Sequence, residues 1–230
     1  VPLARVIAQY GAELAMPFKR YQIAPVWRAD NTQKGRYREF YQCDVDVVGS
    51  NSLTADAEVI ACLNEALQSL GIEDAVIRIN NRELLYSLIA EAGVPQRDRV
   101  DVVRMLDKLD KIGMDKVREE LAILGVNSVV RKKLFEFFDT DIQDPKDIMT
   151  RFEGLSGIGE LAELMEILLE WEIKNYRIDL TLARGLDYYT GTIFEITLPD
   201  AKQYGSVAGG GRYDDLIGRF ASSPPSIKDI

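Results

Sequence analysis

Apolar residues recur with a helical period in the middle of the chain and with a strand period on both sides of it. From about 94 to 174 they follow the i, i+3, i+4 spacing of amphipathic helices, which predicts a wholly helical segment. Alternation of apolar and polar residues elsewhere predicts strands. The expected strands are 20–28, 37–48, 76–79, 177–182, 192–198 and 203–208. The expected helices outside the middle segment are 1–10, 53–70, 83–92 and a short one after Arg212.

This order of elements predicts an α+β fold whose core is interrupted by an insertion. The core comprises 1–93 and 175–230, and the helical insertion domain comprises 94–174. Because hairpins dominate the expected strands, we expect an antiparallel β-sheet flanked by helices.

Composition excludes several classes of function. The 230 residues include 28 Lys+Arg, 37 Asp+Glu and no histidine, so the net charge is −9. Without histidine, the chain itself holds no Ser-His-Asp triad and no His-ligated zinc. No apolar run approaches the ~20 residues of a membrane span, and two cysteines suit a reducing compartment. We therefore expect a cytoplasmic protein without membrane association. Both ends lack the pattern of a domain boundary, which suggests a fragment of something longer.

The 36–47 strand has one polar face that changes character along its length. Successive side chains of a strand point to opposite faces, so even-numbered residues share one face. That face reads Arg36, Arg38, Phe40, Gln42, Asp44 and Asp46. It favours a site with an anion at one end and an ammonium or N–H donor at the other. A solvated face with salt bridges is the alternative. The odd face holds Tyr37, Tyr41, Cys43, Val45 and Val47 and is typical of core.

The hairpin around this strand is locally basic. Residues 19–38 contain six Lys or Arg and one acid, Asp30, inside an acidic protein. Arginine binds phosphate oxygens through paired, charge-assisted hydrogen bonds. A phosphate from a nucleotide, from RNA or from both is therefore the expected ligand.

Two later segments combine glycine with chemistry-bearing residues. The segment 183–191 contains Arg184, Asp187, Tyr188 and Tyr189, and a buried tyrosine pair packed in the core is the alternative to a binding site. The segment 209–214 begins with three glycines. A strand-to-helix turn explains it as well as close approach of the backbone to a ligand does.

Together these segments resemble the class II aminoacyl-tRNA synthetases and, within them, the histidyl-tRNA synthetase family. The stretches 26–30 and 35–46 resemble class II motif 2. The stretch 183–190 is similar to the histidine-specific signature Arg-Gly-Leu-Asp-Tyr-Tyr, and 210–214 is similar to the second such signature. Motif 1, motif 3 and the anticodon-binding domain have no counterpart, so the resemblance implies a catalytic-domain fragment.

The resemblance implies ATP as substrate, with Mg²⁺ arriving on the ATP. By this resemblance Arg28 holds the α-phosphate, Asp30 contacts the adenine amino group and Phe40 stacks on adenine. Arg36 would meet the outer phosphates or the acceptor end of tRNA. Arg184 matches the catalytic arginine that contributes positive charge near the substrate carboxylate and the α-phosphate.

The resemblance also implies a histidine pocket. Its residues are Gln42, Asp46, Arg184, Tyr188, Tyr189, Gly209 and Gly210. Gln42 would bind the α-amino group, Asp46 one side of the imidazole and Tyr189 the other, with Tyr188 beside it. The two glycines would form the floor of the pocket. The implied activity is formation of histidyl-adenylate and transfer to tRNA(His), by a protein that is a homodimer at full length.

A non-catalytic paralogue is the alternative. It would be a synthetase-like regulatory subunit of ATP phosphoribosyltransferase, or a domain that senses uncharged tRNA. Such paralogues typically lose the catalytic arginine or the tyrosine pair. Because Arg28, Arg184, Tyr188 and Tyr189 are all present, the enzyme is favoured.

Overall fold

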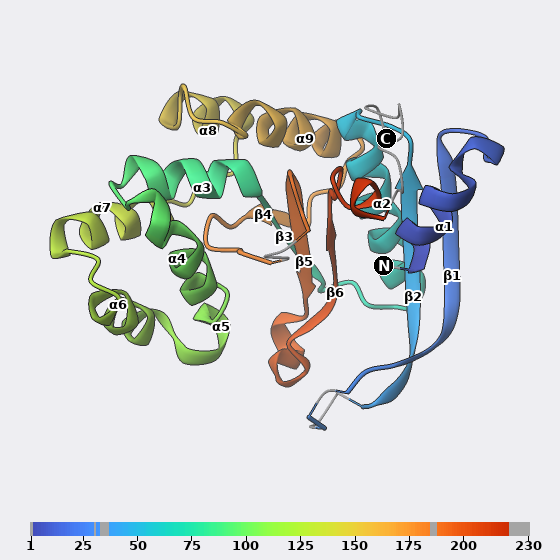
Figure 1. Cartoon of the computed structure of the whole chain (residues 1–230), viewed down its shortest axis with the longest axis horizontal. Coiled ribbons are helices and arrows are strands. Elements are labelled where there is room, and N and C mark those ends of the chain that lie inside the picture. Colours follow the sequence, from blue (N-terminus) through green and yellow to red (C-terminus); the bar gives the residue numbers. More distant parts are fainter. Residues whose placement is uncertain (1, 30, 33–36, 185–187, 221–230) are drawn as a thin grey trace. The chain divides into compact units, whose positions relative to one another are not determined.

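A computed structural model describes residues 2–29, 31–32, 37–184 and 188–220 (Figure 1). The chain forms two compact units. The first unit comprises 1–76, 196–208 and 214–230, and the second comprises 77–195 and 209–213. The helical segment 94–174 lies in the second unit, while the domain boundaries expected at 93 and 175 stay a prediction. Among the described residues, no helix is long and apolar enough to cross a membrane.

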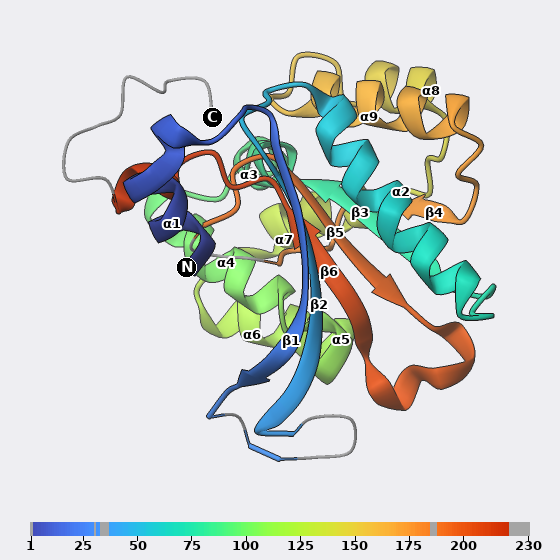
Figure 2. The same cartoon turned by 90° about the vertical axis from the view of Figure 1, so that its right-hand side faces the viewer.

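The first unit is built around a long hairpin. Its elements are α1 (Pro2–Tyr10), the 3₁₀ turn η1 (Gly11–Glu13), β1 (Phe18–Trp27), β2 (Glu39–Val48), α2 (Leu53–Ser69), and the 3₁₀ segments η3 (Pro199–Tyr204) and η4 (Ile217–Arg219). β1 and β2 pair antiparallel from Phe18↔Val48 to Trp27↔Glu39 and run side by side over their whole length (Figure 2). A small core lies at the base of the hairpin, formed by Ala4, Ile7, Val48 and Ile217.

Local signals set the ends of α2. The Ser52 side chain accepts a hydrogen bond from the Thr54 backbone N–H, which satisfies one of the free donors at the helix start. The helix ends before Gly71, whose φ of +77° suits a residue without a Cβ. The helix expected over 53–70 is thus confirmed.

The second unit carries the helical segment 94–174, the helix α3 that precedes it, and most of a sheet. The helices are α3 (Arg82–Glu91), α4 (Arg99–Leu106), α5 (Leu109–Ile112), α6 (Met114–Ile123), α7 (Ser128–Phe138), α8 (Pro145–Arg151) and α9 (Ile158–Glu170), with the 3₁₀ turn η2 (Gln96–Asp98) before α4. The strands are β3 (Val76–Asn81), β4 (Tyr176–Ile178), β5 (Thr192–Thr197) and β6 (Ser206–Gly211), in the order β4-β3-β5-β6. The end of β5 (196–197) and the start of β6 (206–208) belong to the first unit. The expected helical segment is confirmed, and the fold is α+β. The β3–β4 pair is parallel, whereas we expected antiparallel pairing from the hairpins.

Three local expectations were wrong. Residues 179–182 form a turn instead of continuing the strand, because Asp179 accepts hydrogen bonds from the backbone and hydroxyl of Thr181. The glycines 209–211 lie in β6 and not in a turn. The odd face of the hairpin is not core near its tip. Tyr41 is 73% exposed and Cys43 is also exposed, because β1 and β2 pair only with each other among the described residues.

A buried ion network holds the sheet of the second unit. Arg78 on β3 donates from Nε to Asp179 Oδ2 at 2.7 Å and from Nη1 to Asp110 Oδ2 at 2.7 Å. Its Nη1 also lies 3.3 Å from Oε2 of the buried Glu195. Burial alone would raise the pKa of Asp179, but the Arg78 charge and the Thr181 hydrogen bonds hold that pKa below its ordinary value. The folded state therefore favours the ionised Asp179.

We expect Asp179→Asn to lower the free energy of unfolding by about 3–5 kcal/mol at neutral pH, because it removes the buried one of the two carboxylates that lie 2.7 Å from the largely buried Arg78. The ionised Asp179 makes its full contribution to the free energy of unfolding above the pKa of about 4 that its carboxyl has in the unfolded chain. This contribution is lost as pH falls through the lower pKa of the folded state. The difference in free energy of unfolding between wild type and variant should therefore shrink below about pH 4. Urea denaturation at a series of pH values measures it. The control is Asp115→Asn, a change of an exposed acid on α6, and equal losses in the two variants would contradict the network.

Candidate functional site

The even face of the β1–β2 hairpin gathers the predicted polar residues. The register places Ala24 opposite Gln42, Gln22 opposite Asp44 and Arg20 opposite Asp46. Cross-strand neighbours on one face lie within side-chain reach, and Arg20 and Asp46 form an ion pair across the strands. The face therefore brings Phe40, Gln42, Asp44 and Asp46 into one line, as the alternation of the sequence predicted.

One end of this face holds an arginine on an aromatic ring. The Arg28 guanidinium carbon lies 5.2 Å from the centre of the Phe40 ring, and Arg28 Nη2 donates to Gln42 Oε1 at 2.5 Å. Gln42 in turn donates to Asp44 Oδ1. Arg28 is exposed, so its charge is accessible to a ligand that comes to this end. A cation stacked on a ring is a suitable place for a phosphate beside a flat base.

The other end holds a carboxylate whose partner the sequence reasoning missed. Arg20 Nη2 lies 2.7 Å from Asp46 Oδ2, and the two side chains are 21% and 17% exposed. Arg20 Nη1 also donates to Gln22 Oε1 at 2.5 Å. The charges at this end are thus paired across the strands. The signal was available in the basic count of the hairpin, but only the register shows which acid Arg20 meets.

The second unit holds Arg184, Tyr188 and Tyr189, which belong to the stretch that resembles a histidine-specific signature. The rings of Tyr188 and Tyr189 meet edge to face, with centres 4.5 Å apart. Tyr188 is 43% exposed, so the alternative of a buried core pair was wrong. Arg184 donates from Nε to Glu195 Oε1 at 2.9 Å and from Nη2 to the same oxygen. Glu195 was not among the predicted site residues, because its place in the expected strand 192–198 carries no local signal of its distant partners.

The glycines of β6 allow close packing against neighbouring side chains. A Cβ on Gly209 would lie 3.2 Å from Arg184 Nη1, and a Cβ on Gly210 would lie 2.7 Å from the Phe194 ring. These contacts give a structural reason for both glycines inside the protein. Their place as the floor of a histidine pocket stays a prediction. Asp30, Arg36 and the signature residues 185–187 lie outside the described residues.

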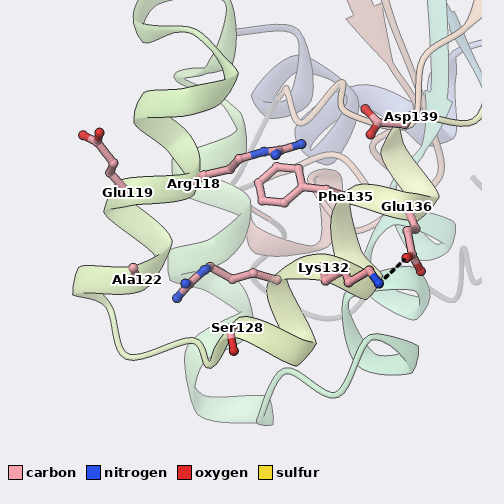
Figure 3. Close-up of a pocket in the computed structure, with 9 residues that line it drawn as sticks. Arg118, Glu119, Ala122, Ser128, Lys132, Phe135, Glu136 and Asp139 are labelled. Atoms are coloured by element: carbon pink, nitrogen blue, oxygen red, sulfur yellow. Dashed lines mark ion pairs between the residues drawn. The ribbon is translucent and has the colours of Figure 1, made fainter.

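A groove of about 530 Å³ lies elsewhere, between α6 and α7 of the insertion (Figure 3). Arg118 covers the Phe135 ring there at 4.5 Å, and Lys132 pairs with Glu136 at 3.8 Å. The groove contains none of the predicted site residues. Its cations alternate with Glu119, Glu136 and Asp139, so its chemistry does not select an anion.

Known proteins are similar to this chain in sequence. A model of the histidyl-tRNA synthetase family matches residues 2–227. The histidine–tRNA ligase of Flavobacterium johnsoniae is 44% identical over 96% of this chain and 48% of its own length. That of Gloeobacter violaceus is 45% identical over 94% of this chain and 51% of its own. The chain thus spans about half the length of the curated relatives it matches.

Solved structures agree with these relatives. The histidyl-tRNA synthetase from Nostoc sp. PCC 7120 superposes with a TM-score of 0.85 at 33% identity, over 97% of this chain and 54% of that one. A structure described as an ATP phosphoribosyltransferase regulatory subunit/histidyl-tRNA synthetase, from Bacillus halodurans, has a TM-score of 0.80 at 24% identity. It covers 95% of this chain and 57% of that one, and at this identity it shows the fold alone.

We expect Gly210→Ala to destabilise the chain by about 1–3 kcal/mol, because the new Cβ would overlap the buried Phe194 ring. Gly159→Ala in α9 is the control, since nothing lies within 4 Å of its Cβ. Alanine there should leave stability unchanged or raise it by up to about 1 kcal/mol. Thermal denaturation measures both. Adding Phe194→Leu to Gly210→Ala should cost less than the sum of the single losses, and a simple sum would contradict the contact.

Proposed function

Because the chain belongs to the histidyl-tRNA synthetase family, we propose that its protein activates L-histidine with ATP and transfers it to tRNA(His). In the first step a carboxylate oxygen of histidine attacks the α-phosphorus, and pyrophosphate leaves. In the second step a ribose hydroxyl of the tRNA attacks the activated carbonyl, and AMP leaves. Neither step needs an imidazole base, which agrees with a chain that has no histidine.

The observation that carries this proposal is the polarity of the hairpin face. At one end Arg28 stacks on Phe40, and at the other lie Asp44 and Asp46. We assign the α-phosphate to Arg28 and the adenine to Phe40, because a guanidinium binds phosphate oxygens and a ring stacks on a base. Fixed positive charge at the α-phosphate stabilises the negative charge that develops there as the bond to the incoming oxygen forms. Asp30 and Arg36 keep their predicted roles on the adenine and the outer phosphates.

At the amino-acid end we assign the α-amino group to Gln42 and one imidazole nitrogen to Asp46. In the second unit we assign the other nitrogen to Tyr189, beside Tyr188, and the substrate carboxylate and α-phosphate to Arg184. A pocket that bonds both ring nitrogens leaves its own polar groups unpaired with any other amino acid. Such sites discriminate by about 10⁴ without editing. Mg²⁺ would enter on the ATP phosphates, because Mg²⁺ keeps several of its waters and is usually bound through substrate phosphates and one or two carboxylates.

The regulatory paralogue is the less favoured function. The chain retains Arg28, Arg184 and the tyrosine pair. It is also 39–45% identical to curated histidine–tRNA ligases. The full-length protein is proposed to be a cytoplasmic homodimer.

We expect this chain to bind a non-hydrolysable histidyl-adenylate analogue, measured by calorimetry, and to bind the alanyl and glutaminyl analogues far more weakly. Asp46→Asn should weaken histidyl binding by about 10–100-fold, because one charged hydrogen bond to the imidazole is lost. Glu39→Gln is the matched control, since Glu39 is an exposed acid on the opposite face of the same strand.

Equal affinity for the three analogues would contradict histidine recognition. Equal loss in the two variants would contradict the role of Asp46. The same titration on the longer natural protein, together with aminoacylation of tRNA(His), then tests the complete activity. Failure there would exclude the synthetase function.

A further inference from the structure

A buried carboxylate links two arginines in the second unit. Glu195 on β5 is 6% exposed, and its two oxygens face different guanidinium groups. Oε1 accepts from Arg184 Nε at 2.9 Å and from Arg184 Nη2, while Oε2 lies 3.3 Å from Arg78 Nη1. Because a buried carboxylate without partners is costly, these contacts make Glu195 dependent on both arginines. No role in the proposed function has been assigned to Glu195 or to Arg78.

The contacts with Glu195 fix the direction of the Arg184 guanidinium. A guanidinium is a rigid planar fork, so two bonds from Nε and Nη2 set the plane of the whole group. The remaining nitrogen, Nη1, lies next to Gly209, where a Cβ would come within 3.2 Å. No residue in the described part of the chain accepts a hydrogen bond from Nη1. The Arg184 side chain is 40% exposed, so a ligand can reach part of it.

Arg78 is itself held from two further sides. Its Nε is bonded to Asp179 after β4, and its Nη1 to Asp110 on α5 of the helical insertion. Burial would lower the pKa of Arg78, but these two carboxylates raise it above the ordinary arginine value, so the group stays charged. Asp110 is the exposed end of the network, with 62% of its side chain accessible. The bonds therefore run without a break from the insertion to Arg184.

We propose that Glu195 is a positioning residue for Arg184, and that Arg78 and Asp110 connect the orientation of Arg184 to the helical insertion. This inference rests on the proposed function, in which Arg184 places its charge at the substrate carboxylate and α-phosphate. A charge fixed before the reaction stabilises the transition state without the cost of reorienting it. A network that only holds strands together would predict the same contacts but no effect through Arg184.

Arginine side-chain NMR of the ¹⁵N-labelled chain tests the positioning without any ligand. Arg184→Lys identifies the Arg184 Nε–Hε signal by its disappearance. With Glu195→Gln this signal should shift and its hydrogen exchange should accelerate, because an amide oxygen is a weaker acceptor than a carboxylate. Asp110→Asn should shift the Arg78 signal and, to a smaller extent, that of Arg184. Asp115→Asn is the matched control on α6 and should move neither.

An unchanged Arg184 signal in Glu195→Gln would overturn the proposal, and an effect of Asp110→Asn that stops at Arg78 would overturn the link to the insertion. Should Glu195→Gln fail to fold, Asp110→Asn still gives the decisive spectrum, since it alters only the exposed end of the network.

A double-mutant cycle with the histidyl-adenylate analogue separates positioning from structural support. Glu195→Gln should weaken binding about tenfold in the wild-type background, which is the loss expected when one charged hydrogen bond is misplaced. In the Arg184→Lys background it should cost nothing further, because Glu195 acts through Arg184. The same loss in both backgrounds would show a merely structural role. If wild type binds no analogue, the proposed function fails, while the NMR experiment still decides whether Glu195 positions Arg184.

Discussion

The buried Arg78 guanidinium is the interaction on which the second unit depends. It joins carboxylates from three separate places in the chain: Asp110 in the insertion, Asp179 after β4 and Glu195 on β5. Ions of opposite sign stabilise a protein interior only when every oxygen and N–H finds a partner. Here Asp179 is completed by Thr181 and Glu195 by Arg184, so the same network that holds the sheet also directs the arginine proposed to meet the substrate.

Polar side chains of the hairpin in the first unit are also paired with one another, although they are more exposed to solvent. Arg28 is bonded to Gln42, and Arg20 Nη2 lies against Asp46, so these side chains have partners without a ligand, while the buried Arg20 Nε has none. A histidine that binds Asp46 must share or replace the bond to Arg20. In the proposed pocket an amino acid without a ring N–H offers Asp46 no bond in exchange, so Asp46 keeps Arg20 and the wrong ligand gains nothing there.

The membership of the histidyl-tRNA synthetase family and the chemistry of the two units support one function from independent directions. The family is established from sequence over 2–227, whereas the bond between Arg28 and Gln42 and the bonds of Arg184 to Glu195 come from geometry. The same fold is shared at 24% identity with a structure described in part as a regulatory subunit, so the fold by itself does not imply catalysis. The choice between a catalytic and a regulatory function rests on the individual side chains.

The sequence by itself determined the helices, the positions of most strands, the faces of the hairpin and the family, because these depend on residues close together in the chain. The stop at Gly71 and the alternation along 37–48 are such local signals. Only the tertiary structure decided which charges meet. Arg78 pairs with acids 101 and 117 residues away, and Arg20 meets Asp46 because of the strand register. It also decided that Gly209 and Gly210 lie in a strand against Arg184 and Phe194. Those outcomes depend on how strands that are distant in the sequence pair, and the local periodicity of a sequence does not indicate that pairing.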